Sequence, residues 1–262
     1  MDKFDLTSFL ARGFGKEHDA LIANVPVEGM DKYHTYSQIR LAPETEKYLY
    51  EEYTSTQVKY YKGSRPLLEK IIDNLHLGNI KSDKEKVIII LQWVAFNIRH
   101  AFYVKHEHET PGNRGFSEEE LIMSGWGWCN EKARIFVSLA QIAGFPARMC
   151  GIFHSDKIHA HMAAEVYVDN KWSFCDPTCA TVISYYVLDS WASAKDLPWN
   201  ENMRNRIDNT YRKNRYKMSK IHGNGKSHVE TIFFKDNPYK MFHQVGITNY
   251  PIFTFPIASE GI

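Results

Sequence analysis

The sequence has few cysteines, no excess of charge of either sign and no long apolar run. Only 4 of its 262 residues are cysteine, and 32 basic residues against 31 acidic ones leave a formal net charge of +1. A nearly neutral chain lacks the basic character of a nucleic-acid-binding protein. No apolar run approaches the ~18 residues that a membrane-spanning helix requires. We therefore expect neither a nucleic-acid partner nor a membrane segment, and the composition leaves the oligomeric state open.

The N-terminus also lacks the basic segment followed by an apolar segment that marks a secretory signal peptide. The cytoplasm is therefore the predicted location. In that compartment the cysteines are expected to be free thiols rather than disulfides. They are Cys129, Cys150, Cys175 and Cys179, and all lie within one third of the chain.

The sequence pattern predicts four helices. Two cover residues 64–77 and 84–100, a short one opens at 116–117 and runs to about 122, and the last begins at Cys129 and ends before Gly144. Apolar residues cover most of the circumference of this last helix, which is typical of a helix in the middle of a domain. The pattern then changes to one typical of strands, rich in Val, Tyr, Trp and Phe. These strands are expected at residues 147–153, 159–168 and 171–175.

The last two strands are expected to form a hairpin with Asp169 and Asn170 at its tip. A two-residue loop would place residue 163 opposite Asp176. Because side chains alternate between the faces of a strand, His161 and Asp176 would then share a face as diagonal neighbours. A three-residue loop would place them on opposite faces, so a contact between the two side chains depends on an even loop.

Cys129 stands at the start of the central helix, directly after the sequence GWGW. The positive end of the helix dipole favours a thiolate there, and the first backbone N–H groups are free to bind an oxyanion. His161 is the candidate base, and Asp176 would fix the tautomer of its ring. Together these residues form a candidate triad that attacks a carbonyl and forms a thioester. His159 is the alternative base.

These residues carry a resemblance to a known family. The stretch GWGWCNEKARIFVSLAQIAGFPARMCG, followed by HMAAEVYVDNKWSFCDPT, resembles the transglutaminase-like superfamily of papain-fold cysteine enzymes. The family pattern has a glycine-rich approach to Cys, a helix that ends in Gly-x-Pro-Ala-Arg, then His, and a Trp shortly before Asp-Pro-Thr. The residues that fill it in order are Cys129, 144–148, His161, Glu165, Trp172 and 176–178.

The resemblance implies an α+β, papain-like fold in which the helix of Cys129 packs on an antiparallel β-sheet. It covers residues 84–180, which we predict to be the catalytic core of a single elaborated domain over residues 1–262. Residues 1–83 and 181–262 are then an N-terminal and a C-terminal extension. The chemistry requires no cofactor, and the calcium used by some animal relatives has no recognisable acidic ligand cluster here, so no metal is expected.

The sequence departs from the family at one position and leaves the oxyanion site incomplete. Many members have Trp two residues after the His, where this chain has Ala163, which puts the acceptor side of the cleft in doubt. The second oxyanion donor, beyond the backbone of Cys129, is also undefined. Trp126 and Trp128 flank the nucleophile and are candidates, although either can equally be a core or groove residue, and Gln92 is a remoter one.

Other polar groups have weaker interpretations. A zinc site is disfavoured, because CxxxC has no second matched pair. Its ligands would come from Cys129, His159, His161, Cys175 and Cys179. The basic residues of 200–226 indicate a solvated helix and loop, or a docking face for a phosphate or carboxylate group. The run at 106–109 is expected to be a solvated loop rather than a set of metal ligands, and it could border the cleft. The segments near 232–234 and 251–256 are expected to return to the core as strand or extended chain.

The sequence is compatible with three functions. The favoured one is a cysteine hydrolase that cuts a peptide or another amide bond through a thioester, with a peptide, a protein or an amide-bearing small molecule as substrate. The second is a transglutaminase-type acyltransferase, in which an amine resolves the thioester. The third is a binding protein that keeps the fold but has lost turnover.

Overall fold

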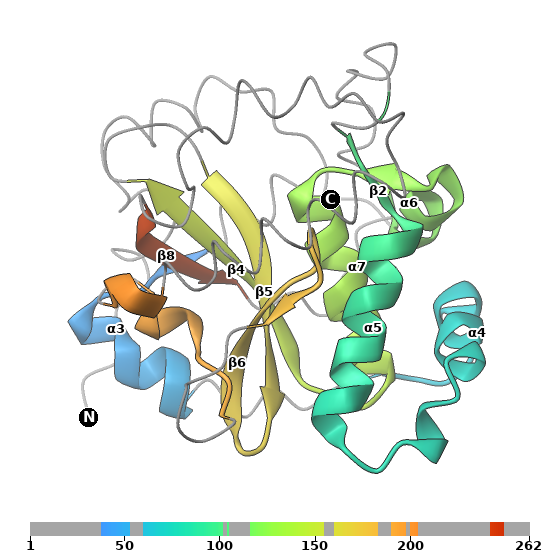
Figure 1. The fold of residues 1–262 in the computed structure, drawn as a ribbon, viewed down its shortest axis with the longest axis horizontal. Helices are drawn as coiled ribbons and strands as arrows, with labels where there is room; N and C mark the ends of the chain where they lie inside the picture. The colour runs from blue at the N-terminus through green and yellow to red at the C-terminus, as the bar shows by residue number, and fades with distance from the viewer. Residues whose placement is uncertain are drawn as a thin grey trace.

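The computed structural model describes residues 38–52, 60–101, 104, 116–154, 160–182, 190–197, 200–203 and 242–248, and all structural statements concern these residues. Among them is a six-stranded sheet in which every neighbouring pair is antiparallel (Figure 1). In spatial order its strands are Ile39–Arg40 (β1), Phe242–Thr248 (β8), Ala147–His154 (β4), Ala160–Val168 (β5), Lys171–Asp176 (β6) and Thr181–Val182 (β7).

Helices lie on both sides of this sheet. Their bounds are Pro43–Lys47 (α3), Pro66–Asn74 (α4), Asp83–Asn97 (α5), Glu118–Ser124 (α6) and Cys129–Ile142 (α7), with short turns at Tyr48–Glu52 (η3), Leu77–Asn79 (η5) and Ala194–Asp196 (η9). On one side α7 packs against β4 and β5, and α4, α5 and α6 pack around α7 (Figure 1). On the other side lies α3. The predicted α+β class, with the helix of Cys129 packed on an antiparallel sheet, is confirmed.

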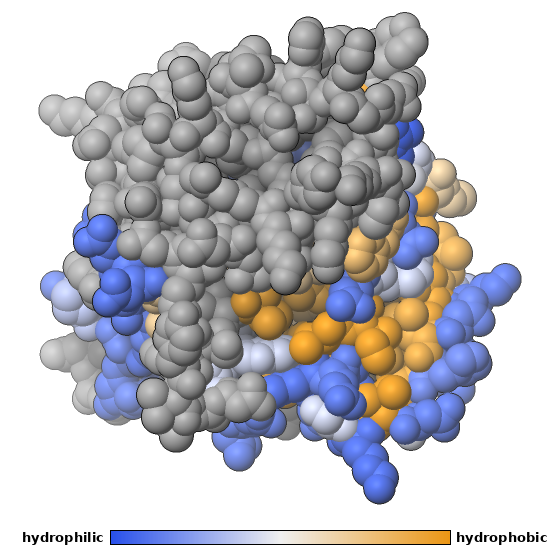
Figure 2. Space-filling view, viewed as in Figure 1, coloured by the Kyte–Doolittle hydropathy of each residue, from blue (hydrophilic) through white to orange (hydrophobic). Residues whose placement is uncertain are grey.

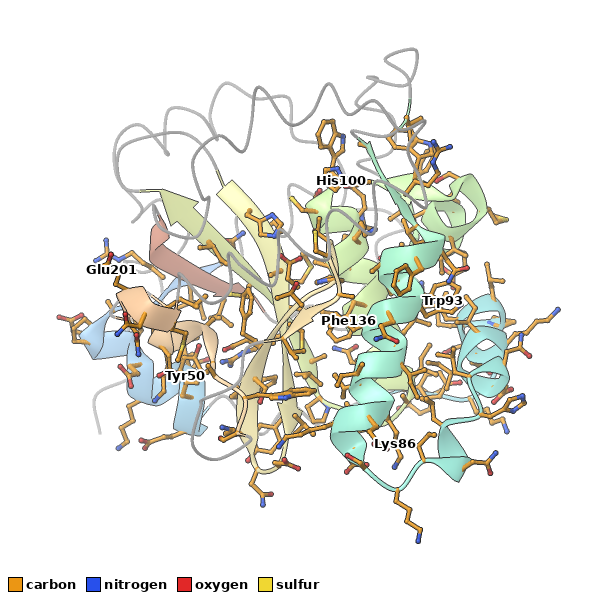
Figure 3. The ribbon with its side chains drawn as sticks, in the orientation of Figure 1. Tyr50, Lys86, Trp93, His100, Phe136 and Glu201 are labelled. Carbon is orange, nitrogen blue, oxygen red and sulfur yellow. The ribbon has the colours of Figure 1, made fainter. Side chains whose placement is uncertain are left out.

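Apolar side chains fill both faces of the sheet. Phe136 of α7 is fully buried on one side, whereas Tyr50 of η3 lies on the other (Figure 3). Helix α5 is apolar on most sides, and its partly buried residues Ile89 and Trp93 pack at the margin of the core, where apolar residues gather on the surface in Figure 2. None of the helices in the described ranges is both long and apolar enough to span a bilayer.

Most of these elements lie where the sequence pattern predicts them. The helices predicted at 64–77 and 84–100 correspond to α4 and α5, but the chain leaves α5 after Asn97. It continues as strand β2 (Arg99–His100), which pairs in parallel with β3 (Trp126–Gly127). The segments expected near 232–234 and 251–256 lie outside the described residues. A C-terminal strand does enter the sheet, as β8, between β1 and β4.

Helix α7 is buried along almost its whole length, as its apolar pattern predicted. Every residue from Asn130 to Gln141 is buried, including three charged residues, Glu131, Lys132 and Arg134. Arg134 pairs with Glu118 of α6 at 3.0 Å, and neither side chain is exposed. The same Glu118 accepts a bond from Arg65 at 2.8 Å. This ion-pair cluster holds α6 against α7 and so fixes the segment that leads to Cys129.

A second buried ion pair joins the sheet to the N-terminal part of the chain. Arg148 of β4 lies directly opposite Glu165 of β5 and bonds it through Nε and Nη2 at 2.9 and 2.7 Å. The guanidinium lies over the rings of Trp172 and Tyr50, at 3.9 and 4.8 Å from their centroids. Its Nη1 donates to the carbonyl of Leu49 at 2.6 Å, so η3 is held on the sheet by the same residue.

Replacing Arg148 should therefore destabilise the protein strongly. In Arg148→Met the carboxylate of Glu165 stays buried without its cation, which is expected to cost about 3–5 kcal/mol of unfolding free energy. Urea denaturation measures this loss. The exposed Lys86–Asp83 pair provides the control, because Lys86→Met should change the free energy by no more than about 0.5 kcal/mol. A loss of unfolding free energy below about 1 kcal/mol for Arg148→Met would contradict the conclusion that Glu165 depends on Arg148 as its buried cation.

The approach to α7 requires a glycine at position 127. A Cβ atom built on Gly127 would lie 2.8 Å from the Cβ of Glu131, on the first turn of α7. Glu131 in turn accepts the backbone N–H of Trp128 through Oε2 at 2.8 Å, which caps the helix directly before Cys129. The close approach of β3 and α7 therefore depends on the missing side chain.

Gly127→Ala should push β3 away from α7, weaken this cap and lower the unfolding free energy by about 1–3 kcal/mol. Thermal and urea unfolding measure the effect. Gly78→Ala is the matched control, because a Cβ at Gly78 meets nothing within 4 Å and the backbone there is not left-handed. Equal stability of the two variants would show that the close approach at Gly127 is not required.

Candidate active site

The β5–β6 hairpin has the register that the sequence predicted. Asp169 and Asn170 form a two-residue turn, with φ of 52° and 61°, and Val168 pairs with Lys171. The ladder continues to Ala164 opposite Cys175, which places Asp176 one step further, opposite residue 163. Left-handed φ at both turn residues is typical of the type I′ turn that closes a two-residue hairpin. The even loop on which the His–Asp contact depends is thus present.

His161 and Asp176 meet at the open end of this hairpin. Nε2 of His161 lies 2.8 Å from Oδ2 of Asp176. The other carboxylate oxygen, Oδ1, accepts the backbone N–H of Thr178 at 2.8 Å. The Asp176 side chain is fully buried, whereas that of His161 retains 15% exposure. Both carboxylate oxygens are therefore held, and the imidazole is the member of the pair that faces solvent.

The side chain of Cys129 lies close enough to the His161 ring to affect its protonation. Because Asp176 engages Nε2, Nδ1 is the ring nitrogen left for the sulfur. Burial lowers the pKa of His161, but the charge and hydrogen bond of Asp176 and the neighbouring Cys129 outweigh it and raise the pKa to about 10. The imidazole is thus protonated at neutral pH, next to a cysteine that begins α7.

The other cysteines are unsuited to nucleophilic chemistry. Cys129 is partly exposed, whereas Cys150, Cys175 and Cys179 are buried, and all four are free. Burial, reinforced by the charge of Glu165, raises the pKa of the Cys150 and Cys175 thiols well above the usual value. They therefore remain protonated packing residues.

The three side chains predicted as candidate oxyanion donors lie on different elements of the structure. Trp128 is the residue before α7, and its ring packs edge-on against His100 at 5.8 Å, while Trp126 is half-buried in β3. His100 lies near the end of α5 in Figure 3. Gln92 is exposed on α5, and the described contacts do not join it to the triad. The backbone N–H groups at the start of α7 remain the best placed oxyanion donors.

Several predicted features lie outside the described residues. These are His159, the run at 106–109 and residues 204–226 of the basic segment. Within the described ranges, no three His, Cys, Asp or Glu side chains come together in an arrangement that could hold a metal ion. No residue of the described site is therefore assigned as a metal ligand.

One buried charged residue of α7 near Cys129 is not revealed by the sequence pattern. Lys132 follows Cys129 by one helical turn and is 1% exposed. The apolar residues around it on the helix predicted a core position, and apolar periodicity does not explain a charged residue there. The one clue in the sequence was the presence of a lysine on a helix face that is otherwise apolar.

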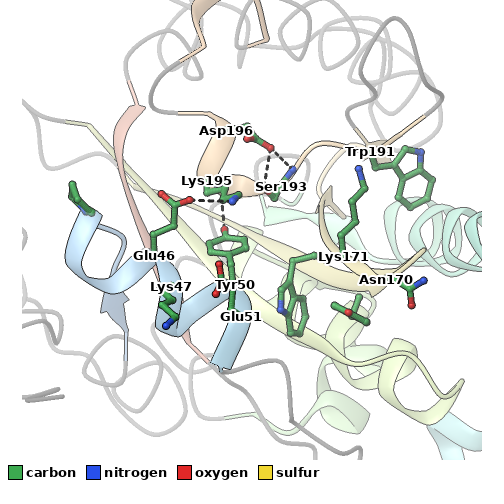
Figure 4. Close-up of a pocket in the computed structure, with 13 residues that line it drawn as sticks. Glu46, Lys47, Tyr50, Glu51, Asn170, Lys171, Trp191, Ser193, Lys195 and Asp196 are labelled. Carbon is green, nitrogen blue, oxygen red and sulfur yellow. Dashed lines mark hydrogen bonds and ion pairs between the residues drawn. The ribbon is translucent and has the colours of Figure 1, made fainter. Parts of the chain in front are cut away.

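A cavity of about 620 Å³ lies at the other end of the hairpin (Figure 4). It is lined by Tyr167, which follows His161 by six residues on β5, or about 20 Å of strand. The charged groups shown in Figure 4 pair with the protein itself: Lys195 binds Glu46 at 3.0 Å, and Asp196 accepts two bonds from Ser193. The cavity is remote from the triad and indicates no particular ligand.

Comparison with known proteins finds a family that this region resembles. Residues 73–177 match the sequence profile of the transglutaminase-like superfamily. No curated protein matches the chain at a significant level. Several solved structures, including the following three, are similar to part of it. A protein from Cytophaga hutchinsonii, provisionally described as a cysteine protease, is 23% identical over 43% of this chain and 37% of its own, with a TM-score of 0.35.

The second structure is the periplasmic domain of TgpA from Pseudomonas aeruginosa, bound to ethylmercury. It is 18% identical over 47% of this chain and 48% of its own, with a TM-score of 0.37. The third, described as a TGase, is 17% identical over 52% of this chain and 39% of its own, with a TM-score of 0.36. The chain therefore spans less than half the length of each of these three proteins.

The matched residues contain all three members of the candidate triad and the hairpin that joins two of them. The resemblance stated from the sequence, the profile match and the α+β architecture agree with one another. Residues 73–177 of this chain are thus similar in sequence to the transglutaminase-like superfamily, as the motifs around Cys129, His161 and Asp176 indicated.

Proposed function

We propose that this protein is a cysteine-dependent acyl-transfer enzyme that hydrolyses a peptide or another amide bond. The observation that carries the proposal is the 2.8 Å hydrogen bond between His161 and Asp176, next to Cys129 at the N-terminus of a buried helix. A thiol, a base and an orienting carboxylate in this order are the groups that nucleophilic catalysis by cysteine requires.

The charge state of the site suggests how the reaction proceeds. With His161 protonated, the sulfur of Cys129 attacks the carbonyl carbon as a thiolate, and the helix N-terminus stabilises the oxyanion. The imidazolium then donates its proton to the leaving amine, and a thioester forms. In the second half, neutral His161 takes a proton from water as it attacks the thioester. The acid product leaves and the thiolate–imidazolium pair is restored.

The same residues would serve amide formation if an amine replaced water in the second half. Water is the simpler acceptor because it requires no binding site of its own, and the described residues define no amine site. Hydrolysis is therefore the leading proposal. Intact-mass spectrometry distinguishes the two reactions when the protein is incubated with glutamine-, peptide- and thioester-bearing donors, with and without an added amine. Hydrolysis predicts free acid in both cases, whereas transfer predicts an amide that depends on the amine.

Substitutions in the triad should slow or prevent formation of the covalent intermediate, to different degrees for different residues. Cys129→Ala should form no adduct with any donor. His161→Asn should acylate at least about a hundredfold more slowly, because the ring no longer stabilises the thiolate or protonates the leaving group. Stopped-flow or quenched mass measurement gives these rates. His76→Asn is the matched control, since His76 is exposed in a left-handed turn that Asn adopts well. Adducts on Cys129→Ala would rule out the mechanism.

The raised pKa of His161 also predicts how stability changes with pH. The folded pKa of about 10 lies above the ordinary value of 6.5, so the His161–Asp176 pair stabilises the fold fully below pH 6.5. That contribution is lost as the pH rises through about 10. The difference in unfolding free energy between wild type and His161→Gln should therefore be larger at pH 6 than at pH 10.5, as urea titrations would show. A difference that does not change with pH would mean that the pair is not charged.

A further inference from the structure

Glu131 is a buried acidic residue in the first turn of α7, two residues after Cys129. It has no exposed surface, and its Oε2 accepts the backbone N–H of Trp128 at 2.8 Å. Trp128 is the last residue before the helix and has an extended backbone. The carboxylate therefore reaches back from inside the helix and binds the residue directly before the candidate nucleophile.

The residue before the helix does not return this contact. In a complete capping box that residue has a side-chain oxygen, which accepts an amide of the first turn while the Glu binds back. The indole of Trp128 has only an N–H donor, and it makes no side-chain cap on α7. Trp128 therefore supplies no side-chain acceptor for the amides of the first turn, so these amides are not committed to a side chain at the cap.

Both polar groups of the Trp128 backbone are held in place. The N–H binds Glu131, and the carbonyl accepts the N–H of Lys132 at 3.1 Å as the first bond of the helix. Because the peptide bond is planar and trans, the N–H of Cys129 points in the direction opposite to that carbonyl. The carbonyl points along α7, so the Cys129 amide points out of its N-terminal end. Its direction is set by the two bonds at Trp128.

The chain that approaches the helix packs directly on Glu131. A Cβ atom at Gly127 would lie 2.8 Å from the Cβ of Glu131 and 3.9 Å from its Oε2. The same segment pairs with β2, where Gly127 lies opposite His100. The backbone before Cys129 is therefore held by strand pairing with β2 and by the Glu131 side chain.

The charge of Glu131 does not in itself favour a reactive thiolate. The helix N-terminus stabilises a carboxylate and a thiolate alike, but two negative groups at the same helix end repel each other. A contribution of Glu131 to the reaction therefore has to come from where its oxygen holds the backbone.

We propose that Glu131 is a positioning residue of the candidate nucleophile, whose side-chain oxygen holds the Trp128 amide and thereby aims the N–H of Cys129 at the oxyanion of a reacting acyl group. This inference rests on the proposed function in taking Cys129 to be the residue that is acylated. Glu131 itself does not touch the substrate and transfers no proton in the reaction.

Two reactions of Cys129 distinguish the backbone amide from the thiol. Acylation by p-nitrophenyl acetate passes through a tetrahedral oxyanion, forms an acetyl thioester and releases p-nitrophenolate. Alkylation by iodoacetamide releases iodide and forms no oxyanion. The reactivity of the thiolate affects both rates, so the ratio of acylation to alkylation reports how well the oxyanion is bound. The other three cysteines are buried, and peptide mass spectrometry confirms the modified residue.

Two substitutions separate the position of the oxygen from its charge. Glu131→Gln keeps an acceptor oxygen at the same reach without the charge, so the ratio should stay within about threefold of wild type. Glu131→Asp keeps the charge but is one methylene shorter. It should lower the ratio at least about tenfold, because a displacement of about 1 Å in a catalytic group is enough for such a loss.

Glu120→Asp is the matched control. Glu120 is the corresponding residue of α6, where it binds back to the N–H of Ser117 at 2.7 Å. The same shortening there weakens a cap on a different helix, and the ratio at Cys129 should remain that of wild type. Circular dichroism and thermal unfolding verify that each variant is folded.

The outcomes for Glu131 and for the proposed function are distinct. A wild-type ratio in Glu131→Asp, or a tenfold loss in folded Glu131→Gln, would overturn the positioning role and leave acyl transfer by Cys129 intact. If Glu131→Asp does not fold, the ratio of Glu131→Gln decides alone, because a charge-based role predicts its loss. If wild-type Cys129 is alkylated but never acetylated, the proposed function fails and the inference fails with it.

Discussion

The contact between His161 and Asp176 is the interaction on which the candidate site depends, and a turn remote from it sets that contact. Asp169 and Asn170 both adopt left-handed backbone angles, which fixes a two-residue loop and therefore the register of the hairpin. A shift by one residue would move one of the two side chains to the other face of the sheet. Asn and Asp tolerate this conformation better than other residues with a Cβ, so the local sequence at the tip determines chemistry about 20 Å away.

The sequence could predict those parts of the site that local patterns encode. The hairpin register follows from alternation and turn residues, and the start of the helix at Cys129 from its apolar periodicity and the glycines before it. Trp172 also stands where the family pattern places it, over the guanidinium of Arg148. What local patterns could not show is the pairing of distant residues. Strand β1 has two residues and lies in the N-terminal extension, and β8 lies in the C-terminal extension. The two strands pair although about 200 residues of chain separate them.

The same limit explains the buried charges. Lys132 and Arg134 lie on a helix that is otherwise apolar. The spacing of apolar residues predicts that their positions are buried, but it does not predict charged residues there or their partners. Their partners come from α5 and α6, far from them in sequence, and only the folded chain brings these groups within hydrogen-bond distance. Gln92, the remoter candidate for the oxyanion donor, is exposed on α5 in the folded chain, which periodicity alone did not show.

Helix α7 thus lies at the centre of the core and also carries the candidate nucleophile at its start, and these two positions impose different demands. A purely structural helix at this position would be most stable with apolar residues throughout, because buried ions repay their desolvation only with good partners. Here three charged side chains are buried on one helix, each with a partner, and each lies within two turns of Cys129. Sequences depart from the usual preference for apolar residues in the core mainly at functional sites. The concentration of buried charge at this end of α7, rather than along the whole helix, is what we expect if the surrounding structure is organised to hold a reactive thiolate.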